Sequence, residues 1–313
     1  MMRRVALSLT VLTGLSGLVY EITWQKYLAT LLGSDSEATA TVLGIFLAGL
    51  SVGYSLFGRW TRRLVARAQA EGRPPRLLFG YGLVEAGIGV YALFFPALFG
   101  LVERFSYALP HAAGGLGFVF DVALATALVG PASVLMGATI PILTQALARD
   151  LEDATRIHAM IYALNTAGAF AGALAAGFLL VPLLGLPGVM FSMGIINLAA
   201  GAIFLALGRR GARVVSLAEG GRAPSVSGFA SYALVALLLG FAMMAFQTIL
   251  IRLGGLSFGA SQFTFSTVVA VFVLCIALGS LGVSALPRIP GSLLVVSVWS
   301  LAALLFLLYT PLQ

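Results

Sequence analysis

The stretch VALSLTVLTGLSGLVYEITWQKYLATLL, residues 5–32, decides the fold class. It is long enough for a helix to cross the hydrocarbon core of a bilayer, and it extends well beyond the apolar segment of a secretory signal. Similar apolar runs follow between short polar intervals, without the alternation typical of β-strands. The pattern predicts an all-α protein. The expected spans are residues 5–32, 38–57, 77–101, 117–143, 159–184, 188–207, 229–253, 263–285 and 292–309.

The composition of the chain is typical of a protein that lies within a lipid bilayer. Hydrophobic residues make up 60% of the sequence and charged residues only 9%, far from the values of a soluble domain. We therefore expect an integral membrane protein, a polytopic bundle of about nine transmembrane helices embedded in a lipid bilayer. The net charge of +7 comes from arginines in short loops rather than from a basic surface, so no nucleic-acid partner is expected.

The distribution of basic residues predicts the orientation. If the N-terminus is cytoplasmic, all of the 18 lysines and arginines fall on the inner side except Lys26, Arg104 and Arg252. Cytoplasmic loops carry the excess of basic residues in membrane proteins. We therefore expect a multi-pass protein with a cytoplasmic N-terminus.

The domain organisation follows from one long polar interval. Residues 208–227 contain several glycines and serines and predict a flexible cytoplasmic linker between a six-helix half, residues 1–207, and a three-helix part, residues 228–313. Shifting the sequence by 226 positions aligns the two parts, with Glu21 opposite Gln247 and Lys26 opposite Arg252. This predicts the six-plus-six repeat of a parallel-repeat transporter fold, with an incomplete second half. The chain is then either a portion of a longer protein or a nine-helix derivative.

Two acidic residues lie inside predicted spans. Glu21 is about 24 Å along the first helix at 1.5 Å per residue, and Glu85 lies in the inner half of the third. An intramembrane carboxylate marks a binding site for a cation or proton, or it is a hydrogen-bonded group that fixes helix packing. Both interpretations stay open for these residues.

Polar residues on other helices complete the candidate substrate-binding set. The fifth span carries Tyr162 and Asn165, where Asn165 either contacts a substrate or hydrogen-bonds a neighbouring helix. Gln247 stands at the repeat-related position of Glu21. The candidate substrate-binding residues are Glu21, Glu85, Tyr162, Asn165 and Gln247.

Glycines and prolines indicate how the helices meet. Gly168 and Gly172 form a small-xxx-small pair that lets a neighbouring helix approach closely, and the second span repeats the device with Gly44, Gly49, Gly53 and Gly58. Pro131 and Pro141 in the fourth span predict a kink or break.

The sequence lacks the signatures of common catalytic and metal sites. Cys275 is the single cysteine, and His111 and His158 stand far apart, so neither a disulfide nor a metal site is expected. No nucleophile–base pair, phosphate-binding loop or cofactor fingerprint is present. We therefore predict that this chain is not an enzyme and has no cofactor.

Three segments carry a resemblance to a known family. GLSGLVYEITWQKYLATLLGSD (residues 14–35), MGATIPIL (residues 136–143) and YALNTAGAFAGALAAGFLLVPLLGLPG (residues 162–188) resemble the membrane domain of bacterial fused major-facilitator and spermidine synthase-like proteins. The resemblance implies a bacterial inner-membrane protein with a major-facilitator-like bundle whose second half is incomplete. It makes Glu21, Trp24, Pro141, Asn165 and Gly168 characteristic positions.

Two departures from that family leave several functions open. The chain contains no Gly-rich aminopropyltransferase-like domain, and Arg62 stands where major facilitators place an aspartate after Gly58. The leading expectation is a membrane anchor or accessory subunit, with other membrane subunits or a soluble synthase-like domain as partners. The alternatives are a transporter of polyamines or other small organic cations by alternating access, and an enzyme subunit completed by another chain.

Overall fold

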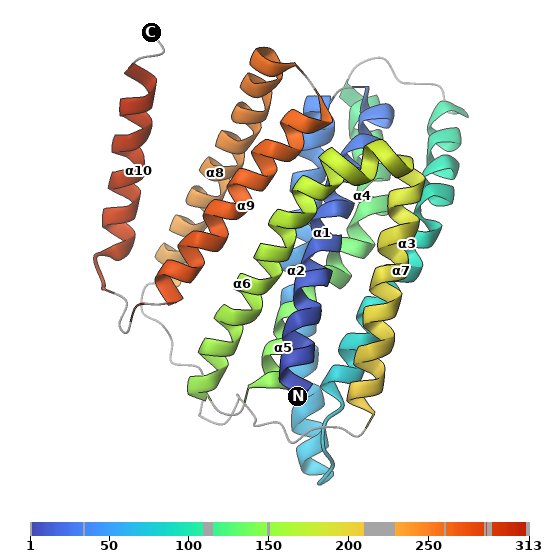
Figure 1. Ribbon diagram of the computed structural model, residues 1–313, viewed down its shortest axis with the longest axis vertical. Helices are drawn as coiled ribbons and strands as arrows, with labels where there is room; N and C mark the ends of the chain where they lie inside the picture. The colour runs from blue at the N-terminus through green and yellow to red at the C-terminus, as the bar shows by residue number, and fades with distance from the viewer. Residues whose placement is uncertain are drawn as a thin grey trace.

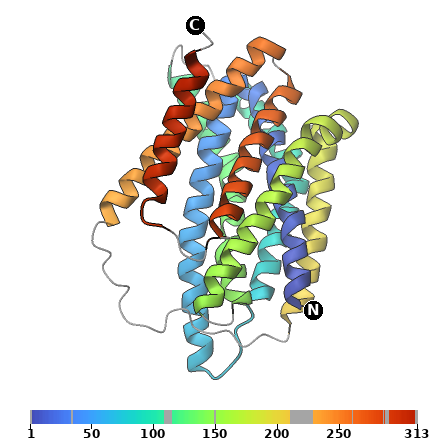
Figure 2. The ribbon, with the colours of Figure 1, turned by 60° about the vertical axis from the view of Figure 1, so that its left-hand side comes forward.

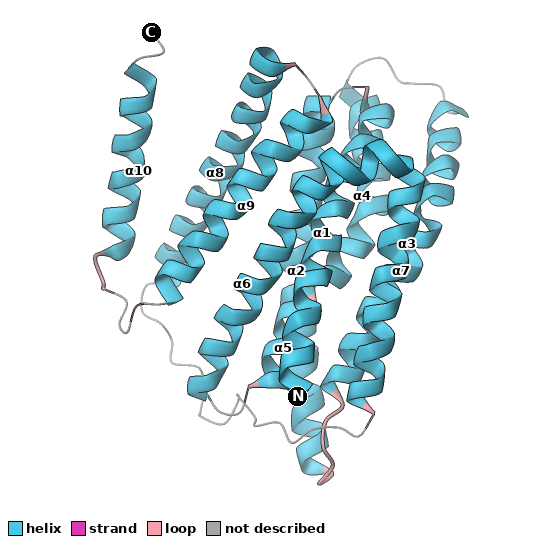
Figure 3. Ribbon diagram, viewed as in Figure 1, coloured by secondary structure: helices cyan, strands magenta, loops and turns pink. Residues whose placement is uncertain are grey.

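The regular elements of the chain are helices. The computed structural model describes residues 2–33, 35–108, 115–148, 151–209, 229–259, 261–284, 286 and 290–310, and within these ranges there is no strand (Figures 1 and 3). The all-α prediction is confirmed. The elements are α1 (Met2–Leu32), α2 (Asp35–Ala70), α3 (Leu77–Ala108), α4 (Gly115–Gly137), α5 (Thr139–Leu147), α6 (Leu151–Ala175), the π-helical η1 (Ala176–Leu180), α7 (Val181–Gly208), α8 (Phe229–Phe258), α9 (Gln262–Ser284) and α10 (Leu293–Tyr309).

The helices are compatible with a membrane. Among the described residues, 7 helices are long and apolar enough to cross one, and Leu293–Leu307 is a shorter apolar helix. One of the seven, Arg156–Gly208, runs through α6, η1 and α7, but Gly185 inside it has φ 65° and ψ 169°. Glycine adopts that conformation at little cost. The backbone can therefore turn at Gly185, which lies between the expected spans 159–184 and 188–207. Each expected span therefore falls on a helix, while the total of nine crossings and the major-facilitator-like fold stay predictions.

Close helix contacts organise the bundle. A Cβ atom on Gly168 or Gly172 of α6 would collide with the backbone of Val11 or Leu15 of α1, so the predicted close approach is confirmed. Gly44 faces open space, and α2 uses only part of its glycine pattern. The same kind of contact joins two further pairs, α2 with α4 through Gly49, Gly53 and Gly137, and α3 with α7 through Gly82, Gly89, Gly194 and Gly201.

The first helix is central, whereas α8 and α10 are peripheral. The most apolar stretch of α1 is 50% buried, whereas that of α8 is only 6% buried. On α1, Trp24 stacks on Tyr20 with ring centroids 5.6 Å apart and packs against Phe95 at 5.8 Å. Figure 1 shows α8, α9 and α10 on one side of the bundle, with α10 outermost, and Figure 2 shows the same side turned toward the viewer. The elements from α1 to α7, with η1, therefore form the main packed body.

The fourth span is interrupted only locally. α4 ends at Gly137, Ala138 forms a turn that keeps right-handed helical backbone angles (φ −70°, ψ −23°), and α5 begins at Thr139. Pro141 has no backbone N–H to donate to the preceding turn, which favours the break at this point. The interruption lies beside the cavity described below.

The proposed division into domains is not resolved by these contacts. Residues 210–228, which contain most of the expected linker, lie outside the described residues. α6, which precedes this interval in the chain, packs against α9, which follows it. At the start of the chain the guanidinium of Arg3 binds the carboxylate of Asp153 at 3.0 Å and joins α1 to α6. The boundaries at residues 207 and 228 therefore stay a prediction.

Candidate functional site

A cavity of about 250 Å³ lies inside the bundle, between the main body and α9. Val273 and Ile276 contribute the wall on α9. Glu85 is the one charged side chain among the described residues that line the cavity. The rest of the polar lining is neutral and includes Thr13, Ser16, Tyr54, Thr139, Tyr162, Asn165, Thr166 and Asn197.

The Glu85 carboxyl group is held at one oxygen. Glu85 is 0% exposed, and its Oε2 accepts a hydrogen bond of 2.6 Å from Nδ2 of Asn197 on α7. Its Oε1 has no hydrogen-bond partner among the described residues. A buried carboxyl oxygen without a partner is costly. The arrangement therefore favours a donor or a cation that binds Oε1.

A buried tyrosine orients the amide that holds Glu85. The Tyr20 hydroxyl on α1 donates to Oδ1 of Asn197 at 3.0 Å, so Nδ2 must face Glu85. Tyr81 lies one turn before Glu85, and its hydroxyl lies beside the Glu85 carboxyl group as well as 3.5 Å from Oγ1 of Thr13. The network joins α1, α3 and α7 through groups that are almost fully buried. We name Tyr20, Glu85 and Asn197 the carboxylate triad.

Glycines bring α3 and α7 close enough for this hydrogen bond. Gly82 and Gly89 flank Glu85 on α3, and a Cβ on Gly89 would lie 2.7 Å from the carbonyl oxygen of Gly194. On α7, Gly194 and Gly201 flank Asn197 in the same way. The short side chain of Asn197 can therefore reach across the helix interface.

The structure brings together three of the expected site residues. Glu85, Tyr162 and Asn165 line the same cavity, whereas Glu21 and Gln247 do not line it. Glu21 is nearly buried on α1 and takes part in none of the described side-chain hydrogen bonds or ion pairs. Whether any of these residues binds a substrate stays a prediction.

Glu21 lies between the cavity and a second one. Gly17, one turn before Glu21, lines the Glu85 cavity, and Gln25, one turn after it, lines a second cavity of about 250 Å³. Residues four apart share one face of a helix. The two cavities therefore follow the same face of α1, separated by the turn that carries Glu21.

Sequence reasoning missed two members of the carboxylate triad. Asn197 is an isolated amide in the apolar span 188–207, and this was a usable signal because polar groups inside a span need a partner. Tyr20 gave no such signal, since a tyrosine in a span is ordinary. Among the described residues no group of three or more metal-binding side chains occurs.

The fold and the site define a class, a membrane-compatible helical bundle with a buried carboxylate cavity. Curated proteins that are similar in sequence narrow this class to one named kind of protein. The chain is 30% identical over 205 residues to the polyamine aminopropyltransferases of Mycobacterium tuberculosis and Mycobacterium bovis, covering 64% of this chain and 35% of each relative. It is 32% identical over 197 residues to that of Corynebacterium efficiens, covering 61% and 32%. The chain thus spans about a third of the length of these relatives.

The relatives correct one prediction and support another. They are named as enzymes, so the prediction that this chain is not an enzyme is wrong. That prediction relied on the absence of catalytic motifs from this chain, which matches only about a third of the length of each relative. The resemblance to spermidine synthase-like proteins is confirmed as a distant similarity over part of the chain. No family model matches the chain, and no solved structure is significantly similar to it.

Proposed function

We propose that this chain is the membrane-embedded part of a polyamine aminopropyltransferase-like protein and that its Glu85 cavity binds a polyamine. The observation that carries the proposal is the unpartnered Oε1 of Glu85 in a cavity lined otherwise by neutral groups. A protonated amine supplies both the positive charge and the donor that this oxygen lacks. The similarity to polyamine aminopropyltransferases supports an amine of this type.

The size of the cavity agrees with a narrow aliphatic amine. Its volume of about 250 Å³ lies below the range of roughly 300–1,000 Å³ found for drug-sized ligands. Tyr162 and Asn165 provide neutral polar groups on the wall formed by α6. Because Glu85 is fully buried, an amine reaches Oε1 only when side chains of the wall move.

Replacing Glu85 with glutamine is expected to weaken spermidine binding at least tenfold. The substitution keeps the shape and lets Asn197 still donate to the side-chain oxygen, but it removes the charge that pairs with an ammonium group. A charge-assisted hydrogen bond contributes about 1.5–3 kcal/mol, equivalent to roughly ten- to a hundredfold in affinity. Equilibrium binding of radiolabelled spermidine to the detergent-purified protein measures the change.

Glu103→Gln is the matched control, because Glu103 lies on the same helix and does not line the cavity. It should bind spermidine as tightly as the unmodified protein does. Saturable binding that is identical in the Glu85 and Glu103 variants would remove Glu85 from the site.

A purely anchoring role is the second candidate. The last helices present large apolar side chains outward, among them Phe241, Leu256 and Trp299, and such faces suit lipid or another membrane protein. An anchor or accessory subunit should extract in mild detergent with a stable partner chain and should bind no spermidine. Transport is a third candidate. It would appear as spermidine uptake by proteoliposomes that Glu85→Gln reduces through the cavity and Glu21→Gln reduces at the next turn of α1.

The proposed location is the bacterial inner membrane, with a cytoplasmic N-terminus. The arginines support this orientation, because they are concentrated in the connections at the end of the bundle where the N-terminus lies, including the turn between α2 and α3. In a Cys275→Ser background, a cysteine placed at the exposed Glu71 in that turn should resist impermeant maleimides in intact cells and react after lysis. Equal labelling in intact and lysed cells would reverse the orientation.

A further inference from the structure

We propose that the Glu85 carboxyl group holds a proton in the absence of an amine and gives it up when an ammonium group binds. The inference rests on the proposed amine site and adds an exchange of one cation for another on the same carboxyl group. It is carried by the complete burial of Glu85, by its unpartnered Oε1, and by the lack of any other charged side chain among the described residues that line the cavity.

The polar groups around the carboxyl group form hydrogen bonds but carry no positive charge. Asn197 on α7 donates to Oε2, the hydroxyl of Tyr81 on α3 lies beside the carboxyl group, and the hydroxyl of Tyr20 on α1 holds the amide of Asn197. Tyrosines are neutral at physiological pH, because an ordinary phenol ionises at about pH 10. Among the described lining residues, α4 and α9 contribute apolar side chains or glycine, and α1, α2, α5 and α6 contribute uncharged polar groups at Thr13, Ser16, Tyr54, Thr139, Tyr162, Asn165 and Thr166.

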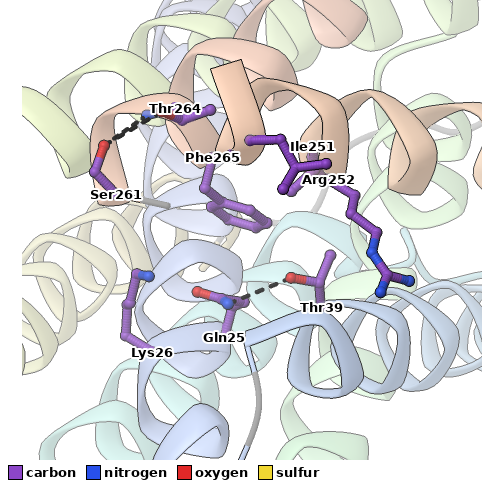
Figure 4. A pocket seen from close by; sticks show the side chains of 10 residues that line it. Gln25, Lys26, Thr39, Ile251, Arg252, Ser261, Thr264 and Phe265 are labelled. Atoms are coloured by element: carbon purple, nitrogen blue, oxygen red, sulfur yellow. Dashed lines mark hydrogen bonds between the residues drawn. The ribbon is translucent and has the colours of Figure 1, made fainter. Parts of the chain in front are cut away.

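The cations of α1 lie toward the two ends of the helix, and none of them lines this cavity. Lys26 lines the second cavity together with Arg252 of α8 (Figure 4). At the other end of α1, Arg3 binds Asp153 at 3.0 Å and Arg4 is exposed. A positive partner for Glu85 therefore has to be a bound proton or a bound ligand.

A proton fits the carboxyl group without disturbing its neighbours. When the proton is on Oε1, Oε2 still accepts the hydrogen bond of 2.6 Å from Asn197, so the carboxylate triad persists. A neutral carboxylic acid also avoids the large desolvation penalty of a buried, unpaired carboxylate. The proton is therefore the occupant in the amine-free protein, and an ammonium group is the occupant that replaces it.

The exchange conserves the charge of the site. The ammonium group keeps its own protons, the O–H bond at Oε1 breaks, its electron pair stays on the carboxylate, and the released proton passes to water. One proton leaves for each ammonium group that binds at Glu85, and the site is neutral before and after. Because the proton and the amine compete for one oxygen, the affinity for the amine should decrease as the pH is lowered.

The test uses the detergent-purified full chain. At neutral pH, the infrared spectrum of the amine-free protein should contain the C=O band of a protonated carboxyl group that the spectrum of Glu85→Gln lacks. Perfusion with spermidine should remove this band and release about one proton per bound molecule, and the affinity should fall by up to about tenfold per pH unit on acidification. A pH-indicator dye in weak buffer measures the release, and radiolabelled spermidine measures the affinity. Aliphatic amines stay protonated at neutral and acidic pH, so the pH dependence reports on the protein.

Glu103→Gln is the matched control, because Glu103 lies on the same helix and does not line the cavity. It should keep the infrared band, the proton release and the pH dependence of the unmodified protein. Glu85→Gln should release no proton, and its residual spermidine binding should not depend on pH.

The outcomes separate this inference from the proposed function. If spermidine binds without proton release, or if the band persists in Glu85→Gln, the exchange is wrong while the amine site is retained. A proton release that Glu21→Gln abolishes and Glu85→Gln keeps would place the proton on Glu21 and overturn the inference. If the band belongs to Glu85 but no spermidine binds, the proposed amine site is wrong, and the exchange is wrong with it.

Discussion

Gly168→Val should yield almost no folded, monodisperse protein. The new Cβ atom would collide with the backbone carbonyl oxygen of Val11, which cannot move without displacing the whole of α1. Overpacking typically costs 1–3 kcal/mol when side chains can adjust, and a clash between two backbones leaves less room for adjustment. We therefore expect a loss of more than about 3 kcal/mol, visible as aggregation in fluorescence-detected size-exclusion chromatography.

Gly44→Val controls for the effect of a β-branched residue in a helix. No other atom lies within 4 Å of a Cβ placed at Gly44, so this variant should elute and unfold like the unmodified protein. If both variants behave alike, the close contact between α1 and α6 does not determine stability.

Asn197→Leu should combine a loss of stability with weaker amine binding. It removes the donor to Oε2 of Glu85 and the acceptor for the hydroxyl of Tyr20 at once. Each unsatisfied buried polar group costs about 1–3 kcal/mol, so a destabilisation of about 3 kcal/mol is expected, with a decrease in the thermal unfolding midpoint. Spermidine affinity should fall about tenfold, because Glu85 is no longer positioned.

A second substitution separates this cause from a simple packing defect. The double variant Asn197→Leu with Glu85→Leu also removes the carboxyl group that Asn197→Leu alone leaves without a partner. Its stability should therefore be higher than that of Asn197→Leu alone. Thermal unfolding of the two single variants and the double variant measures the coupling. Strictly additive effects would show that the Asn197–Glu85 contact contributes nothing.

The helices were predictable because a helix that crosses lipid needs a long run of apolar residues. Long apolar runs identified the helices, and the spacing of Gly168 and Gly172 predicted the close contact with another helix. Pro131 and Pro141 predicted a kink or break in the fourth span, and α4 passes through Pro131 and ends at Gly137, shortly before Pro141. Such features depend on neighbouring residues, so a single sequence contains them.

The cavity was only partly predictable because distant helices build it. Glu85 and Asn197 are 112 positions apart, and nothing in either segment indicates that they meet. Glu21 had the same kind of signal as Glu85, yet it lies one turn beyond the cavity lining. A buried acid can be recognised from sequence, but its partner depends on how α3 packs against α7.

The carboxylate triad also limits how the protein can change shape. Moving α7 away from α1 or α3 would leave polar groups without partners in a medium of low dielectric constant, which is costly. Moving α9 away from α6 would uncover mainly Val273 and Ile276 on the cavity side. We therefore expect the helices of the triad to stay together, whereas a displacement of α9 would break none of the triad's hydrogen bonds.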